Sequence, residues 1–144
     1  RDTDRSRGLG DVYKRQSQYY PYIRPQETGN KTALRWWKVV NDGGMGLCFH
    51  SDREFAASAL NRLCDDLDDG ADKYIRQSHG NLVGPRELTA VNIDGAQQGL
   101  GCIDSWKSEP RPQYMLEAGD YEFRFVVTPM RSDNFRGTYK KVDI

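Results

Sequence analysis

The alternating stretch YEFRFVV, residues 121–127, constrains the fold of this chain more than any other feature. Successive side chains of a β-strand point to opposite faces of its sheet, so Tyr121, Phe123, Phe125 and Val127 share one apolar face. The residues between them are mostly charged. This spacing predicts a strand with one aromatic face buried, and therefore a β-sheet packed on a hydrophobic core.

Other segments of the chain carry the same kind of signal. Two β-rich runs flank the turn cluster NDGG at residues 41–44, which predicts a hairpin. An acid-rich helical turn is expected after residue 63. With little helical periodicity elsewhere, the pattern predicts an all-β fold, an antiparallel β-sandwich. The expected strands, besides 121–127, are residues 34–40, 45–50, 55–63, 88–93 and 114–117.

Residues 91–106, VNIDGAQQGLGCIDSW, read as a strand that runs into a glycine-rich loop. Gly99 and Gly101 give this loop backbone freedom that other residues lack. The chain can then turn tightly before Trp106. The segment therefore predicts a loop that presents one large aromatic side chain, whose alternative fate is burial in the core.

Three ordered blocks of the sequence resemble the end of the large-type β-galactosidases of glycoside hydrolase family 2. Residues 92–94, NID, precede glycines and a DSW triplet at 104–106, as in that family's C-terminal domain. The run PYIRPQETGNKT at 21–32, followed by RWW, and the SH pair at 78–79 are similar to the family pattern too. Cys102-Ile103 stands where the family has Gly-Asp.

The resemblance implies the small-chain, or domain 5, type of fold. That fold is a galactose mutarotase-like supersandwich about twice as long as this chain, so only its later part is expected here. We assign residues 17–129 to this β-sandwich domain and residues 130–144 to a polar tail. Residues 1–16 lack periodicity and resemble a non-native leader, so we leave them out of the fold prediction.

The resemblance also implies that substrate binding and catalysis involve different domains. Trp106 would form an apolar platform for a galactoside, and the residues expected to support its loop are Gly99, Gly101, Asp104, Ser105 and His79. The family's two catalytic glutamates lie in an upstream TIM barrel of the same chain, so this segment is expected to be non-catalytic. The whole enzyme would hydrolyse terminal non-reducing β-D-galactosides such as lactose with retention.

Cofactors and partners follow from the same resemblance and from composition. No cofactor or metal is expected in this segment; Mg²⁺, with Na⁺ in some members, would bind elsewhere in the full-length enzyme, which can be a homo-oligomer. Residues 1–16 hold five basic and three acidic residues, which leaves 16 basic and 18 acidic residues in the remainder. This balance gives no sign of nucleic-acid or membrane-surface binding. The compartment stays open between bacterial cytoplasm and periplasm.

The residue pattern also bears on the cysteines and on two alternative functions. Cys48, Cys64 and Cys102 lack CxxC spacing, so each is expected to be a buried or half-buried free thiol. A free-standing carbohydrate-binding module is one alternative function. A mutarotase-like enzyme is another, in which His79 would act with a carboxylate, Glu87 or Asp104.

Overall fold

The computed structural model describes residues 17–68, 79–99 and 108–131, and within these ranges β-strand predominates over helix. The prediction of an antiparallel all-β fold is confirmed. In order, the elements are β1 (Lys31–Val40), β2 (Met45–Leu60), the short helix α1 (Cys64–Leu67), the 3-10 turn η3 (Gly80–Leu82), β3 (Ala90–Asp94), the 3-10 turn η4 (Pro112–Tyr114) and β4 (Phe125–Arg131).

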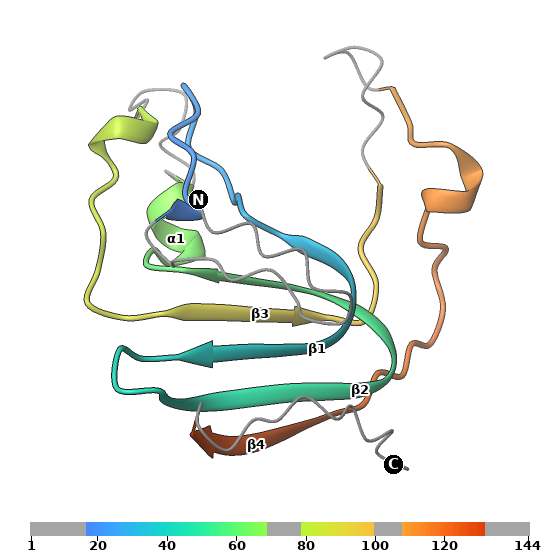
Figure 1. Cartoon of the computed structure of the whole chain (residues 1–144). Coiled ribbons are helices and arrows are strands. Elements are labelled where there is room, and N and C mark those ends of the chain that lie inside the picture. The colour runs from blue at the N-terminus through green and yellow to red at the C-terminus, as the bar shows by residue number, and fades with distance from the viewer. Residues whose placement is uncertain (1–16, 69–78, 100–107, 132–144) are drawn as a thin grey trace, which may run out of the picture.

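The long strand β2 organises the sheet (Figure 1), because each of the other three strands pairs with it in antiparallel fashion. β1 pairs along one edge of β2 and forms the expected hairpin with it. β3 and β4 share the opposite edge: β4 pairs with residues 45–51 of β2, and β3 pairs with residues 56–60. β2 therefore carries the chain from the half of the sheet that contains β4 into the half that contains β3.

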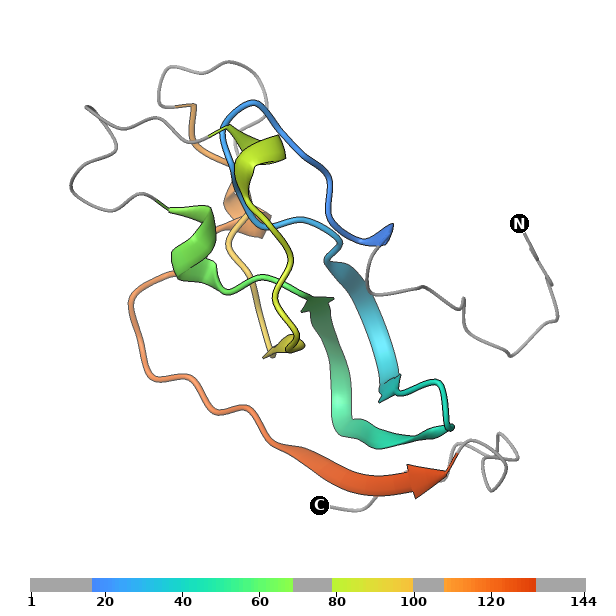
Figure 2. The same ribbon diagram turned by 90° about the vertical axis from the view of Figure 1, so that its left-hand side faces the viewer.

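The sheet bends where β2 passes between these two halves. Leu34 pairs with Phe55, yet Trp36 pairs with His50, so residues 51–54 of β2 lie opposite a single residue of β1. Extra residues in one strand of an antiparallel pair bend it and increase its twist. Figures 1 and 2 show β1 and β2 curving together at this point, so the β4 half turns away from the β3 half.

The hydrophobic core sits inside this bend. Phe49 from the β4 half meets Phe55 and Ala57 from the β3 half, and side chains of both halves pack around them: Leu34, Trp37, Val39, Val91, Ile93 and Phe123. Every residue from 55 to 60 of β2 is buried. A strand buried on both faces has no polar face, which is why its sequence, FAASAL, is mostly apolar instead of alternating. Its one polar residue, Ser58, accepts a hydrogen bond from the Asn92 amide.

The two adjacent tryptophans behave as their spacing predicts. Neighbours on a strand face opposite sides. Trp37 packs against the core cluster, whereas Trp36 lies on the other face of β1 and is half-buried. Lys38 places its ammonium 5.7 Å from the centre of the Trp36 ring.

The structure corrects two strand predictions near the end of the chain. Residues 115–117 are irregular and follow the 3-10 turn η4, so no strand occupies 114–117. The last strand runs over Phe125–Arg131, not 121–127, and Pro129 lies within it. β4 pairs with β2, and this pairing sets where the strand begins and ends. The alternation of residues along β4 does not specify that pairing, so the predicted bounds were wrong.

Candidate functional site

The base of the predicted aromatic loop is visible at the end of the segment that follows β3. Gly99 lies there, while the other predicted residues of this loop, Gly101, Asp104, Ser105 and Trp106, lie outside the described residues. The structure therefore shows how the loop is anchored, and the placement of its aromatic tip stays a prediction.

A hydrogen bond between backbone groups closes the loop at its base. The N–H of Gly99 donates to the carbonyl oxygen of Tyr114 across 2.7 Å. A Cβ atom at Gly99 would lie 2.6 Å from the Cβ atom of Tyr114, which leaves no room for a larger residue. The chain leaves the sheet at the end of β3, Asp94, and the backbone at Gly99 and Tyr114 meets farther along, at the base of the loop.

Side chains from the PQETGNKT block support the same base. The Asn30 amide donates to Oε1 of Gln97 at 2.9 Å, and the Gln97 amide donates to Oδ2 of Asp94 at 2.8 Å. Gly95 packs under Phe123, whose Cβ atom would lie 2.8 Å from a Cβ atom placed on the glycine. Two blocks more than 60 residues apart in the sequence therefore meet at the start of the loop.

His79 lies just ahead of η3, in the part of the chain that precedes β3. It is exposed, and its side chain makes no capping hydrogen bond. Its neighbour Gly80 is buried and holds the N-terminal segment: Gly80 N–H donates to the carbonyl of Tyr22 at 3.1 Å, and the Tyr19 hydroxyl donates to the carbonyl of Gly80 at 2.7 Å. Figure 1 shows η3 and the base of the loop beyond opposite ends of β3.

An ion pair between Asp66 of α1 and Arg86 connects the helix to the segment that precedes β3. Arg86 donates from Nε and Nη2 to the two carboxylate oxygens of Asp66, at 2.7 and 2.5 Å, and the Leu63 N–H adds a third bond to Asp66 at 2.8 Å. Hydrogen bonding from Arg86, and then from the Leu63 backbone, lowers the pKa of Asp66 below its ordinary value.

The lowered pKa of Asp66 predicts a loss of stability in acid. A carboxyl whose pKa is depressed by folding stabilises the native state above its unfolded pKa, and this contribution disappears as the pH falls below about 4. The drop in urea midpoint between pH 7 and pH 3 should therefore be smaller in Asp66→Asn than in the wild type. Asp65→Asn, an exposed neighbour, is the control and should keep the full drop. Equal acid dependence in all three proteins would contradict this assignment.

A hollow of about 430 Å³ opens between residues 24–27 and α1. It is lined by Arg24, Pro25, Gln26, Glu27, Cys64, Leu67 and Asp68. The Cys64 thiol donates to a Glu27 oxygen at 2.7 Å, and this bond raises the pKa of the thiol. Such a thiol stays protonated near neutral pH and is a poor nucleophile.

The sequence pattern did not predict this hollow, because its walls are far apart along the chain. Cys48 and Cys64 are both free thiols, as predicted. Cys48 is buried, as expected, but the expected burial is wrong for Cys64, which is exposed. α1 is a single short turn, so it leaves Cys64 uncovered. Cys102 lies outside the described residues.

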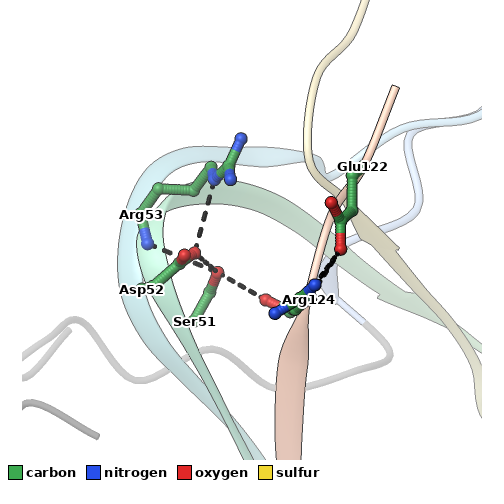
Figure 3. A network of polar contacts seen from close by, with 5 residues as sticks. All are labelled: Ser51, Asp52, Arg53, Glu122 and Arg124. Atoms are coloured by element: carbon green, nitrogen blue, oxygen red, sulfur yellow. Dashed lines mark hydrogen bonds and ion pairs between the residues drawn. The ribbon is translucent and has the colours of Figure 1, made fainter. Parts of the chain in front are cut away.

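A second polar region surrounds the bend of β2 (Figure 3). Buried Ser51 donates its hydroxyl to the carbonyl of Arg124 at 2.9 Å and so ties the bend to the start of β4. Around it, Arg53 contacts Asp52 at 3.3 Å, and Arg124 donates to Glu122 at 2.6 Å. These ion pairs are exposed, so each contributes little to stability. They keep the surface of the sheet polar where β2 bends and faces water.

The described residues offer neither a metal site nor a membrane span. Within residues 17–68, 79–99 and 108–131, no three His, Cys, Asp or Glu side chains are grouped so that they could hold a metal ion. In the same part of the chain, no helix is long and apolar enough to cross a membrane.

Comparisons with known proteins agree on one family. The family described as "Beta galactosidase small chain" matches residues 2–127. A β-galactosidase of Priestia megaterium is 31% identical over 114 residues, which cover 78% of this chain and 10% of that protein. A β-galactosidase small subunit of Latilactobacillus sakei is 28% identical over 120 residues, which cover 75% of this chain and 36% of that subunit.

The matched region is a small share of each relative. β-Galactosidase BgaC of Bifidobacterium adolescentis is 33% identical over 101 residues, 68% of this chain and 9% of that protein. The chain thus spans about a tenth of the long relatives and about a third of the small subunit.

Proposed function

This chain belongs to the β-galactosidase small chain family, and from that premise we propose that it is the non-catalytic part of a retaining β-galactosidase of glycoside hydrolase family 2. In this role it completes the sugar-binding site with Trp106, while a catalytic TIM barrel supplies the two glutamates. The substrates are terminal non-reducing β-D-galactosides such as lactose.

The anchored loop base is the observation that supports this proposal most directly. Gly99 and Tyr114 close the loop with a backbone hydrogen bond, and the Asn30–Gln97 bond attaches this base to the PQETGNKT block. Rigid attachment lowers the entropy lost when a loop binds its ligand. A loop held in this way suits an aromatic side chain that must reach a site built mainly by another domain.

Trp106 fits the chemistry of sugar recognition. The C–H face of a galactoside packs against a flat apolar ring, while its hydroxyl groups bind polar groups at the rim of the site. An indole adds binding energy to substrate and transition state alike, so it acts mainly on the Michaelis constant.

The carboxylates of the described residues support a non-catalytic role. A retaining glycosidase needs two carboxyl groups about 5 Å apart, one of which has a raised pKa. Asp66 is held by Arg86 with a lowered pKa, Asp52 and Glu54 at the bend contact arginine side chains, and Glu27 at the hollow accepts a hydrogen bond from the Cys64 thiol. The proposal places the Mg²⁺ and Na⁺ sites in the rest of the enzyme.

Trp106→Ala in the complete enzyme tests this function. We expect KM for lactose to rise about tenfold with a smaller change in kcat, because about 1.4 kcal/mol of stacking energy is lost. Trp106→Phe keeps an aromatic face and should recover part of the affinity. Steady-state kinetics with lactose decides the matter, and KM and kcat that match the wild type in both variants would overturn the sugar-platform role.

A further inference from the structure

β1 begins with a backbone conformation that is unusual for a strand. Ala33 has a φ angle of 54°, and no other non-glycine residue of the described ranges has a positive φ. This left-handed region brings the Cβ atom close to the backbone carbonyl, so residues other than glycine rarely adopt it. Such strain persists only where the surrounding structure holds it, and it is found most often near functional sites. The conformation of Ala33 therefore indicates a role for this part of β1.

The strained residue lies in a β-bulge. The register of β1 and β2 contains one extra residue between Lys31 and Leu34, where residues 32 and 33 lie opposite Ala56 alone. A shift of one residue exchanges the two faces of a strand for everything beyond it. The bulge therefore decides which way the chain faces at Lys31 and at the preceding residue, Asn30.

These two residues make hydrogen bonds in different directions. Lys31 donates from Nζ to the carbonyl of Gly29 at 2.6 Å and to Oε1 of Gln18 at 2.7 Å, so it holds the N-terminal segment. Asn30 instead donates to Oε1 of Gln97, beyond the end of β3. The bulge thus leaves Lys31 to secure its own segment and turns Asn30 toward the loop.

The contact of Asn30 continues to the sheet, because Gln97 donates in turn to Asp94. We call the series Asn30–Gln97–Asp94 the bridge. Asp94 is the last residue of β3 and pairs with Ala56, the same residue of β2 that faces the bulge from its other edge. The bridge therefore connects the two edges of β2 at the level of the bulge, and it joins the start of β1 to the start of the loop.

Two attachments fix the direction of a loop where one does not. The Gly99–Tyr114 hydrogen bond closes the loop, and the bridge adds a second attachment at Gln97, two residues before Gly99. We propose that the bulge and the bridge position the sugar-binding loop, with Asn30 and Gln97 as positioning residues that act through Trp106. This inference rests on the proposed function, because it assumes that the loop binds the galactoside.

Asn30→Ala in the complete enzyme tests the bridge. We expect KM for lactose to rise about threefold with little change in kcat, because a hydrogen bond that orders the loop before substrate binds is lost. Asn30→Gln keeps the amide donor and should recover most of the affinity. Asn81→Ala removes an exposed asparagine in η3, and as the control it should leave KM unchanged.

The effect should depend on Trp106. In a Trp106→Ala background, Asn30→Ala should leave KM unchanged, because a positioning residue acts through the group that it positions. A further rise in that background would overturn the positioning role. So would a wild-type KM in Asn30→Ala when Trp106→Ala alone raises KM, and this result would leave the proposed function intact. Wild-type kinetics in Trp106→Ala would instead overturn the proposed function, and the positioning role with it.

Amide hydrogen exchange measures the bridge without lactose. The N–H of Gly99 closes the loop base, so Asn30→Ala should speed its exchange about threefold or more in the complete enzyme. Amides of residues 36–40, which pair with β2, should keep the wild-type rate. Unchanged exchange at Gly99 would overturn the proposal. Faster exchange with an unchanged KM would show that the bridge supports the loop base without positioning the sugar-binding residue, which also overturns it.

Ala33→Gly and Ala33→Val test the bulge. Glycine adopts a positive φ without steric cost, whereas a β-branched residue disfavours it, so valine favours the regular register that turns Asn30 away from Gln97. KM for lactose should therefore be about threefold higher in Ala33→Val than in Ala33→Gly. Equal KM values in two folded variants would overturn the role of the bulge. Circular dichroism verifies folding, and the Asn30 variants decide the matter if Ala33→Val does not fold.

Discussion

Phe55→Ala is expected to lower the free energy of unfolding by about 3–5 kcal/mol, the usual cost of removing a buried phenylalanine ring. Phe55 is 3% exposed and is a member of the core cluster inside the bend. Its ring lies 6.4 Å from that of Phe123, so the substitution leaves a cavity between the two halves of the sheet. Small domains have only about 5–15 kcal/mol in total, so this single change should remove a large part of the stability.

Urea unfolding followed by tryptophan fluorescence measures this effect. Ile23→Ala is the control, because Ile23 is an aliphatic residue that is 84% exposed, and the change should alter stability by less than about 0.5 kcal/mol. If Phe55→Ala were as stable as the control, the core would not lie where β2 bends.

Gly46→Ala should destabilise the hairpin of β1 and β2 by about 1–3 kcal/mol or more, the range for overpacking in a closely packed region. Gly46 is opposite Val40, and its added Cβ atom would overlap the carbonyl oxygen of Val39. It would also lie 2.7 Å from the Cα atom of Val40. These obstacles are backbone atoms, so the strands must separate locally before the methyl group fits.

Gly84→Ala is the matched control for this prediction. A Cβ atom at Gly84 would meet nothing within 4 Å, and the residue does not have a positive φ angle. Replacing glycine at such a position reduces the entropy of the unfolded chain, so this variant should be more stable by about 0.4–1 kcal/mol. Thermal unfolding of the two variants should therefore shift in opposite directions, and a Gly46→Ala variant as stable as Gly84→Ala would show that the close approach at Gly46 is unimportant.

Strand prediction succeeded where sequence-local signals were sufficient. The turn cluster at 41–44 and the β-rich runs on either side specify the hairpin, and the acidic turn after residue 63 appears as α1. Prediction failed where pairing with a distant strand decides. The YEFRFVV pattern predicts a buried aromatic face, but Tyr121, Phe125 and Val127 are exposed. β4 begins only at Phe125, where residues of β2 provide pairing partners.

Prediction of the candidate site was likewise limited to features that local sequence specifies. The loop that ends in Trp106 stays a prediction. Gly99 was expected to give this loop backbone freedom, but it has no positive φ angle, and its tight approach to Tyr114 explains the need for glycine at that position. Neither the Gly99–Tyr114 bond nor the Asn30–Gln97 bond was predicted, since each joins residues that no local pattern relates. The hollow beside Cys64 was missed for the same reason.

The sequence by itself determined the fold class and the family, because alternation, turn residues and motif order are properties of neighbouring positions along the chain. Only the tertiary structure decided that β2 is one continuous strand bent around the core and that β3 and β4 share its edge. It also decided that the apolar face of β4 is open. Burial depends on which distant surfaces meet, and two faces with equally apolar sequences differ only in whether another layer lies against them.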